Sequence, residues 1–427
     1  MGRTLVAAVA FFGLAGQIAN AEEVLIHAGK VLAVPGEGYL TEQTIRIEDG
    51  VITGLEDGYR RARRGDTVID LKEGFVLPGL IDSHVHISSE RGPESNMRPL
   101  RDSSVDTALY GARNALRTLE AGFTTVQDVG GDNEAVFSLR DAIDRGYVSG
   151  PRIRASGRAV TPTGGHGDAN GYSPAITQLA TEMSFNACNG VDDCRRAVRE
   201  TIRSGADLIK ITATGGVLSN TAAGLGQQFF DDELEAIADT AHSMGRKVTA
   251  HAHGKDGIEA ALRAGIDSIE HGTYLDAETI ALFNETGATL VPTVLAGVTV
   301  TGWTEEDWLP APSRAKAAVV GPQMLDMLRR AREGGVNVAF GTDTGVSRHG
   351  DNANEFALMV EAGYAPEEAI RAATVIASSH IEMADQIGTI EPGKLADIVA
   401  VDGDPLEDVA ELLDVDFVMK GGTVYKE

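Results

Sequence analysis

Polar and apolar residues follow one pattern near both ends of this chain and another pattern between them. From residue 22 to residue 77, short runs such as TIRIEDGVITGL alternate apolar with polar residues and are punctuated by glycine. This pattern predicts β-strands joined by tight turns. Residues 384–427 show the same alternation of apolar and polar residues with glycine between the runs. We therefore predict that the two ends of the chain pair in one small β-sandwich.

Over residues 78–383, apolar strand-like runs alternate with helical runs. The strand-like runs are FVLPGLIDSHVHI, TTVQDVG, RIRASGRAV, ADLIKITATG, KVTAHAHG, SIEHGT, TLVPTV and NVAFGTDTG. Alternation of this kind is typical of an α/β protein with a parallel sheet, and eight strands over roughly 300 residues predict a (β/α)8 TIM barrel. A doubly wound open sheet is the alternative, although no G-x-G-x-x-G loop follows the first strand.

The first 21 residues have the composition of a secretory signal peptide. Arg3 precedes an apolar run over residues 5–15, and the small residues Ala19 and Ala21 frame a cleavage site. The apolar run is too short to span a bilayer as a resident helix. We therefore predict a periplasmic or secreted protein with residues 1–21 removed. An N-terminal core helix or a lipid anchor is the alternative.

Composition limits the classes of partner. The chain has 427 residues, of which 43% are hydrophobic and 23% charged, as in ordinary soluble globular proteins. Its net charge of -26 argues against nucleic acid and anionic membranes, because contacts with phosphate groups need a surplus of lysine and arginine. We expect a small-molecule amide or dipeptide as the partner, no membrane association after signal cleavage, and a homo-oligomer.

Two cysteines occur in the chain, Cys188 and Cys194. Cysteines this close together in an exported protein favour one local disulfide. A pair of free thiols is the alternative.

Ionisable residues interrupt the carboxyl ends of several predicted strands. They are His84, His86, Lys210, His251, His271 and Asp343. In a barrel these ends meet at one face, so we expect the six side chains to converge. Imidazoles together with a carboxylate suit Zn²⁺ and similar cations. The alternative is a set of core polar residues satisfied by hydrogen bonds.

Lys210 does not fit a metal site in its usual form, because a protonated amine repels cations. It fits if the amine reacts with CO₂ to give a carbamate, an anionic ligand with two oxygens. Burial favours the neutral amine that this reaction needs. A buried ion pair is the alternative.

These residues and their surroundings resemble the amidohydrolase superfamily, in its binuclear branch with a carboxylated lysine. The resemblance includes HVHI, Lys210, the histidines and Asp343, together with the segments GFVLPGLIDSHVH and GTIEPGKLADIVAVDGDP at either end of the predicted barrel. It implies two Zn²⁺ ions per chain, with other divalent ions also able to serve. His84, His86 and Asp343 would hold one ion, His251 and His271 the other, and the Lys210 carbamate would bridge them.

The resemblance also implies a mechanism. A hydroxide shared by the two metals would attack a carbonyl carbon, and Asp343 would pass its proton to the leaving nitrogen. His253, two residues after His251 on the same strand face, matches a histidine that is not a ligand in relatives. It would polarise the carbonyl or contact the substrate, and an orienting role is the alternative.

TPTGGHGD, IKITATGGVLS and IEHGTYLD resemble the imidazolonepropionase-like group, which includes Xaa-Pro and Xaa-Arg/Lys dipeptidases and ochratoxin-hydrolysing enzymes. We therefore predict cleavage of the amide bond to a C-terminal amino acid that is apolar, aromatic or proline, with ochratoxin A among the expected substrates. His166 is the candidate contact for the substrate carboxylate, or alternatively a structural loop histidine. Val217 and Ser88 are further candidate contacts. A cyclic-amide hydrolase of the imidazolonepropionase type and a non-catalytic binding protein are the alternatives.

Overall fold

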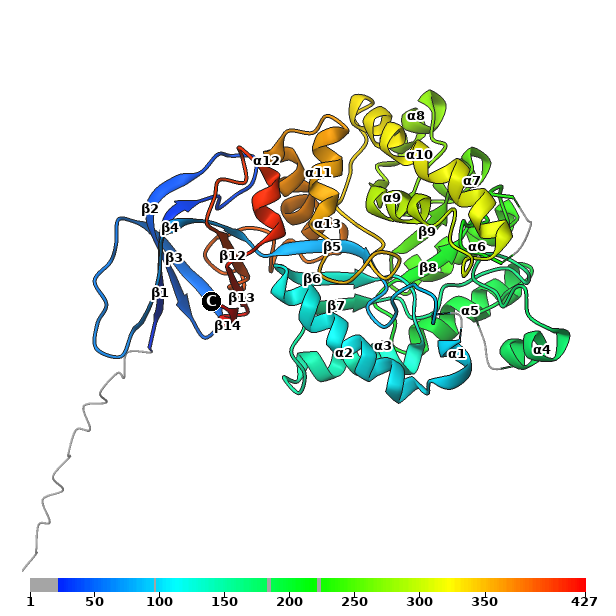
Figure 1. Ribbon diagram of the computed structural model, residues 1–427, viewed down its shortest axis with the longest axis horizontal. Coiled ribbons are helices and arrows are strands. Elements are labelled where there is room, and N and C mark those ends of the chain that lie inside the picture. The colour runs from blue at the N-terminus through cyan, green and yellow to red at the C-terminus, as the bar shows by residue number, and fades with distance from the viewer. Residues whose placement is uncertain (1–21, 96, 183–185, 221–223) are drawn as a thin grey trace, which may run out of the picture.

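The computed structural model describes residues 22–95, 97–182, 186–220 and 224–427. The strands of this α/β structure form one seven-stranded sheet and two smaller parallel sheets, of four and three strands. Figure 1 shows the seven-stranded sheet at one side and the parallel sheets, surrounded by helices, at the other. The predicted signal peptide lies outside the described residues.

Both ends of the chain contribute to the seven-stranded sheet, as the alternating pattern predicted. The strand order is β14-β13-β12-β4-β1-β2-β3, in which β4 pairs with β1 on one edge and with β12 on the other. The described strands here are hydrogen-bonded into one continuous sheet. They are β1 (Val24–Val31), β2 (Leu40–Glu48), β3 (Val51–Asp57), β4 (Thr67–Pro78), β12 (Ile398–Val401), β13 (Phe417–Lys420) and β14 (Thr423–Lys426).

Apolar side chains from both ends of the chain form a hydrophobic core for this sheet, separate from the main core. One glycine is required for the pairing. The register between β1 and β4 shifts around Gly29, where a Cβ would lie 1.9 Å from the carbonyl oxygen of Lys72.

The two parallel sheets lie between the halves of the seven-stranded sheet in the sequence. The first contains β5 (Leu80–Val85), β6 (Phe123–Asp128) and β7 (Arg152–Ala155). The second contains β8 (Ile209–Thr212), β9 (Val248–Ala252), β10 (Ser268–His271) and β11 (Thr289–Val291). A parallel bridge between Val160 and Ile211 joins the segment after β7 to β8.

The predicted eighth strand, residues 337–345, is corrected by the structure. This bridging segment makes single parallel bridges, through Val338 to Leu290 of β11 and through Thr344 to Val85 of β5, but no ladder. Asp343 and Gly345 have φ angles of 57° and 114°, which take the backbone out of the extended region. The bridging segment therefore connects the two sheets without forming a regular strand.

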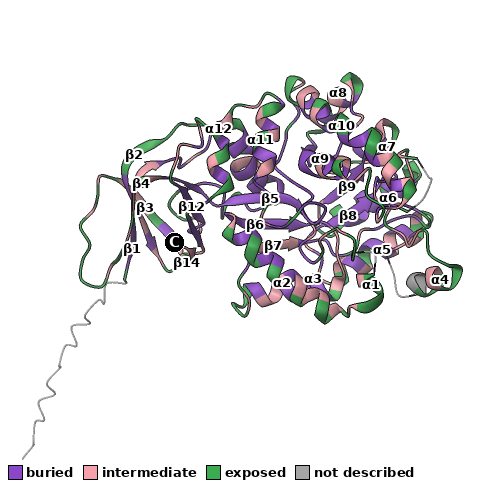
Figure 2. Cartoon of the chain, viewed as in Figure 1, coloured by how far each residue is buried: buried purple, intermediate pink, exposed green. Residues whose placement is uncertain are grey.

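Helices surround the parallel sheets, and Figure 2 shows buried central strands between helices with exposed outer faces. Several helices begin at side chains that cap their free amides, such as Ser103 and Asp276. No helix in the described part of the chain is both long and apolar enough to cross a bilayer. The helices are α1 (Arg98–Arg101), α2 (Ser104–Glu120), α3 (Asn133–Asp144), α4 (Pro174–Glu182), α5 (Val191–Arg203), α6 (Asp231–Ser243), α7 (Lys255–Arg263), α8 (Ala277–Thr286), α9 (Val294–Gly302), α10 (Ala311–Glu333), α11 (Asn354–Glu361), α12 (Pro366–Arg371), the π-helix η1 (Ala372–Ile376), α13 (Ala377–His380) and the 3₁₀-helix η2 (Val409–Leu413).

The predicted disulfide between Cys188 and Cys194 is present. Cys194 lies in the first turn of α5, and both cysteines are fully buried in the main core. The bond therefore fastens α5 to the segment that precedes it.

Candidate active site

The six predicted ligand residues come together at the carboxyl ends of the parallel strands. All of them line one cavity of about 550 Å³. They are His84 in β5, His86 just after it, Lys210 in β8, His251 in β9, His271 at the end of β10 and Asp343 in the bridging segment.

His84, His86 and Asp343 form one group, in which the three ligand atoms lie within 4.8 Å of one another. Asp343 Oδ1 is 3.2 Å from His86 Nε2 and 3.5 Å from His84 Nε2. The other ring nitrogens have partners elsewhere. His84 Nδ1 is 2.5 Å from Glu270 Oε2, and His86 Nδ1 is 2.7 Å from the Gly130 carbonyl. Because these partners accept hydrogen, both Nε2 atoms keep a lone pair for a metal.

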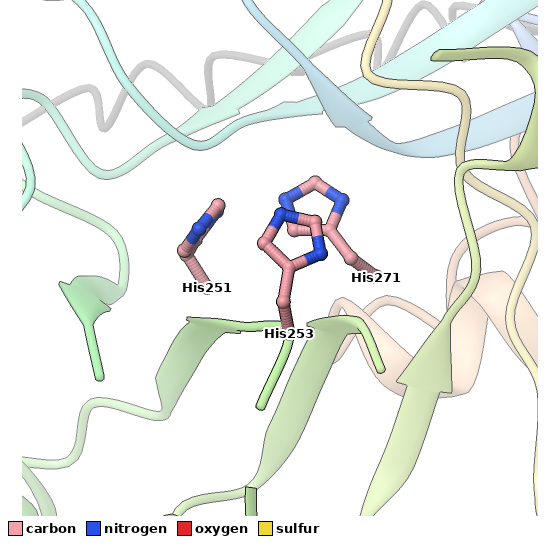
Figure 3. A group of neighbouring side chains, drawn as sticks. All are labelled: His251, His253 and His271. Carbon is pink, nitrogen blue, oxygen red and sulfur yellow. The ribbon is translucent and has the colours of Figure 1, made fainter. Parts of the chain in front are cut away.

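His251, His253 and His271 form a second group with ligand atoms within 4.8 Å of one another. Figure 3 shows the three imidazoles pointing from neighbouring strand ends into a common region. His271 Nδ1 is 2.7 Å from Thr293 Oγ1, and His253 Nδ1 is 2.8 Å from Thr273 Oγ1. Each threonine therefore fixes the orientation of one ring.

Three buried atoms of the cluster lack a hydrogen-bond partner in the described part of the chain. They are Lys210 Nζ, His251 Nε2 and Asp343 Oδ1. Buried polar atoms are almost always paired, so three unpaired atoms in one cluster call for a further occupant. Imidazole nitrogens and a carboxylate oxygen are ligands for divalent transition metals. The cluster therefore fits a metal centre.

The electrostatics of the cluster agree with this fit. Burial lowers the pKa of Lys210, His251 and His271, which favours the neutral forms. Burial alone would raise the pKa of Asp343, but the neighbouring His84 and His86 hold the pKa of its carboxyl well below the usual range. Burial and Lys210 would also lower the pKa of His84, but Glu270 and Asp343 raise it. Lys210, His251 and His271 thus place neutral nitrogens beside an anionic oxygen, as a metal requires.

The backbone around the cluster is strained. His271, Thr293 and Asp343 have φ angles of 70°, 51° and 57°, a region that residues other than glycine rarely adopt. Such conformations cost on the order of 1–3 kcal/mol each and persist where surrounding structure holds them. Here the Asp343 N–H donates to the His84 carbonyl at 2.8 Å, and the Thr293 N–H donates to the Gly341 carbonyl at 3.1 Å.

The sequence profile of the amidohydrolase family matches residues 75–425, which include every residue of the cluster. The chain belongs to the amidohydrolase family.

Relatives of this amidohydrolase include the groups indicated by the sequence motifs. An ochratoxinase of Aspergillus niger is 32% identical over 95% of this chain and 87% of its own length. The crystal structure of a Xaa-Pro dipeptidase with bound methionine in the active site is 40% identical, covers 95% of this chain and 100% of its own, and has a TM-score of 0.91. An imidazolonepropionase of Nocardia farcinica is 26% identical over 86% of this chain and 88% of its own length.

One functionally placed residue that the sequence motifs missed is Glu270. Its carboxylate is fully buried and accepts hydrogen bonds from His84 Nδ1 and from the Thr249 hydroxyl. A carboxylate that holds the second nitrogen of a ligand histidine fixes the ring and increases its basicity. A glutamate within the buried strand SIEH, next to His271, was the available signal.

Two further buried carboxylates hold the backbone near the ligands of this amidohydrolase. Asp82 accepts from the N–H and the hydroxyl of Thr342, at 3.1 and 2.6 Å, and so ties β5 to the bridging segment. Asp128 accepts from the Gly130 N–H at 3.2 Å, and the carbonyl of the same glycine accepts from His86. Burial raises the pKa of Asp82 and of Asp128 to about 6.

The predicted substrate contacts are only partly brought to the cavity. His166 and Val217 line it, whereas Ser88 does not. Ser88 is a correction: its side chain lies against the backbone of Gly131, where a Cβ would be 2.9 Å from the Ser88 hydroxyl oxygen. The next residue, Ser89, lines the cavity instead.

His166 is part of the cavity wall beside the second histidine group. Its Nδ1 is 2.5 Å from Ser219 Oγ, and its ring stacks on His251 with centroids 4.2 Å apart. Burial lowers the pKa of His166 to about 3, so the imidazole is neutral at neutral pH. A Cβ on Gly216 would lie 2.2 Å from this ring, so glycine is needed there for the ring to fit.

Apolar side chains form another part of the cavity wall. α9, α10 and the loop between them supply most of these, together with the segment after β8. They are Val217, Leu218, Ala296, Val300, Trp308, Leu309, Val320 and Met324.

Proposed function

We propose that this protein is a binuclear metal-dependent amidohydrolase that cleaves the amide bond to a C-terminal amino acid. The observation that carries the proposal is the convergence of the six ligand-type side chains in one cavity, with three buried polar atoms unpaired among the described residues. The amide substrates of the dipeptidase and ochratoxinase relatives are implied by their names.

In this proposal His84, His86 and Asp343 would hold one ion, His251 and His271 would hold the other, and a carbamate on Lys210 would supply oxygen ligands to both. Zinc is the proposed metal, since neutral imidazoles and anionic oxygens suit it. Two bound divalent ions would supply a water activated at neutral pH and a positive charge to polarise the amide carbonyl.

The chain's own residues move the proton and orient the substrate. The Asp343 carboxylate accepts the proton released by the attacking water and returns it to the departing nitrogen. His253 is neutral, because burial lowers its pKa to about 4. With Nδ1 engaged by Thr273, its Nε2 is left to contact the substrate carbonyl. His166 contacts the substrate from the same side of the cavity, because it stacks on His251.

The preferred end group is apolar, aromatic or proline, because the wall built from α9 and α10 is apolar. The methionine bound in the dipeptidase relative is an amino acid of this type. N-acyl aromatic amino acids such as ochratoxin A are therefore among the proposed substrates.

We also propose that the two parallel sheets and the bridging segment close into a (β/α)8 barrel, since bridges connect β7 with β8, β11 with the bridging segment, and that segment with β5. The seven-stranded sheet would fold over its own core as a sandwich. The protein would act in the periplasm or outside the cell, where its disulfide would persist.

A panel of N-acyl amino acids and dipeptides that differ only in the C-terminal residue tests the function. The metal-loaded protein should release the C-terminal amino acid, fastest for apolar and aromatic residues. Metal analysis should find close to two divalent ions per chain, and removal of the ions should abolish turnover until zinc is restored. Faster turnover of imidazolone than of any acyl–amino acid would favour the imidazolonepropionase alternative and overturn the proposal.

A further inference from the structure

One cationic side chain in the cavity has no role in the proposed metal centre. Of the lysines and arginines in the described residues, only Arg91 and Lys210 line the cavity. Arg91 lies on the loop after β5, and its backbone N–H donates to the Gly345 carbonyl at 2.6 Å. This bond anchors the loop to the residues that follow Asp343.

The guanidinium of Arg91 lacks an internal partner. In the described part of the chain it has neither a hydrogen bond nor an ion pair. Arg91 is an exposed residue that lines the cavity, and desolvation by neighbouring atoms lowers the pKa of its guanidinium. A guanidinium nevertheless stays protonated in proteins. The cavity therefore contains a charged guanidinium whose N–H donors have no acceptor among the described residues.

The other polar residues of the cavity cannot supply that acceptor. Asp343 and Tyr172 act on Arg91 only through charge, without a hydrogen bond or ion pair, and Asp343 lies beside His84 and His86 as a proposed metal ligand. Asp168 accepts from the backbone amides of Gly164 and Ala169, at 2.7 and 2.8 Å. An anion that pairs with Arg91 must therefore come from the ligand.

We propose that Arg91 binds the free α-carboxylate of the substrate's C-terminal amino acid and so restricts the enzyme to amide bonds next to a free C-terminus. The inference rests on the proposed function and names the substrate class of the same site. A planar guanidinium matches a carboxylate with two parallel hydrogen bonds, which is the strongest form of this contact.

Two other side chains are weaker candidates for this role. His166 is neutral, so it offers a hydrogen bond but no charge. Lys316 donates to the Ser219 carbonyl at 2.9 Å and does not line the cavity. Lys316 thus holds the segment that carries Ser219, the hydrogen-bond partner of His166.

The test compares two substrates with the same scissile amide, N-acetyl-phenylalanine and N-acetyl-phenethylamine, which lacks only the carboxylate. Arg91→Met should lower kcat/KM for the first about 10- to 100-fold, the scale of a hydrogen-bonded charge pair, mainly through KM. It should leave kcat/KM for the second unchanged. Arg91→Lys keeps the charge but not the fork, so it should fall between. The matched control is Arg145→Met, which removes an exposed arginine at the end of α3.

Calorimetry supplies a readout that does not depend on turnover. Free L-phenylalanine should bind the metal-loaded parent protein and the Arg145→Met variant equally, and Arg91→Met at least about tenfold more weakly. Equal loss on both substrates, or unchanged phenylalanine affinity in Arg91→Met and Arg91→Lys, would overturn the inference. If the parent hydrolyses no acyl–amino acid yet binds phenylalanine through Arg91, the proposed function fails and the carboxylate site stands.

Discussion

Replacing Glu270 by glutamine should weaken metal binding without creating a cavity in the core, because the two side chains are of similar size. Glu270 is fully buried and accepts two hydrogen bonds, from His84 Nδ1 and from the Thr249 hydroxyl. A glutamine side chain has one oxygen, so it cannot accept both bonds in this geometry. Either His84 loses the partner that fixes its Nε2 toward the metal, or the threonine is left unpaired, and in both cases the buried negative charge disappears.

Loss of a carboxylate that orients a ligand histidine costs about 10- to 100-fold in metal affinity. Because Glu270 loses its charge as well as one bond, we expect the upper end, a weakening of about 100-fold, or about 2.7 kcal/mol of metal-binding free energy. The assay is competition for zinc between the protein and a coloured chelator of known affinity. Glu233→Gln is the control, because Glu233 is also buried but caps α6 and accepts from the Phe230 N–H. If Glu270→Gln binds zinc within twofold of Glu233→Gln, the orienting role assigned to Glu270 is wrong.

Four further outcomes are expected. Asp343→Asn should lower turnover on the order of 10²-fold or more, far beyond any change in substrate affinity, because it removes the proton carrier. Steady-state kinetics on proteins with equal metal content checks this, and a loss confined to KM would contradict it. Lys210→Ala should lose metal and activity together, and short carboxylic acids should restore part of the activity; an active, metal-loaded Lys210→Ala protein would refute the bridging carbamate. Thiol titration of the unfolded, unreduced protein should detect neither Cys188 nor Cys194 as a free thiol. Burial raises the pKa of Glu355 to about 8 from the ordinary 4.5, so the folded protein retains a proton there that the unfolded chain releases, and the stability from this group is present below about pH 4.5 and lost as the pH rises to about 8. Urea unfolding should therefore show the free energy of unfolding falling more steeply with pH in the parent than in Glu355→Gln. Parallel curves of unfolding free energy against pH would count against this prediction.

The convergence of the candidate ligands could be predicted from the sequence because all six lie near the carboxyl end of an apolar run. His84 and His86 are two residues apart and so face the same side of a strand, and the carboxyl ends of parallel strands meet, so their convergence could be predicted. The pairing of the two chain ends could also be predicted, because alternating apolar and polar runs at both ends expose apolar faces that need a common core.

Other features depend on partners that are remote in the sequence. Glu270 lies 186 residues from His84, so nothing local marks it as the partner of a ligand histidine. The bridging segment reads as a strand by its apolar residues, but the left-handed backbone at Asp343 is imposed by contacts with β5. Ser88 illustrates the limit of adjacency: it follows the ligand pair in sequence, yet its side chain points to Gly131.

The seven-stranded sheet sets an order for the assembly of the chain. β4 is paired on its second edge by β12, in which Ile398 lies opposite Pro78. As the chain is made and, as proposed, exported, β1 to β4 emerge first, and that edge of β4 stays unpaired until the whole helical part has followed. An open edge is a template for pairing with another chain, and contacts so distant in sequence form slowly. Demand for chaperones should therefore be greatest in the interval between the emergence of β4 and the emergence of β12.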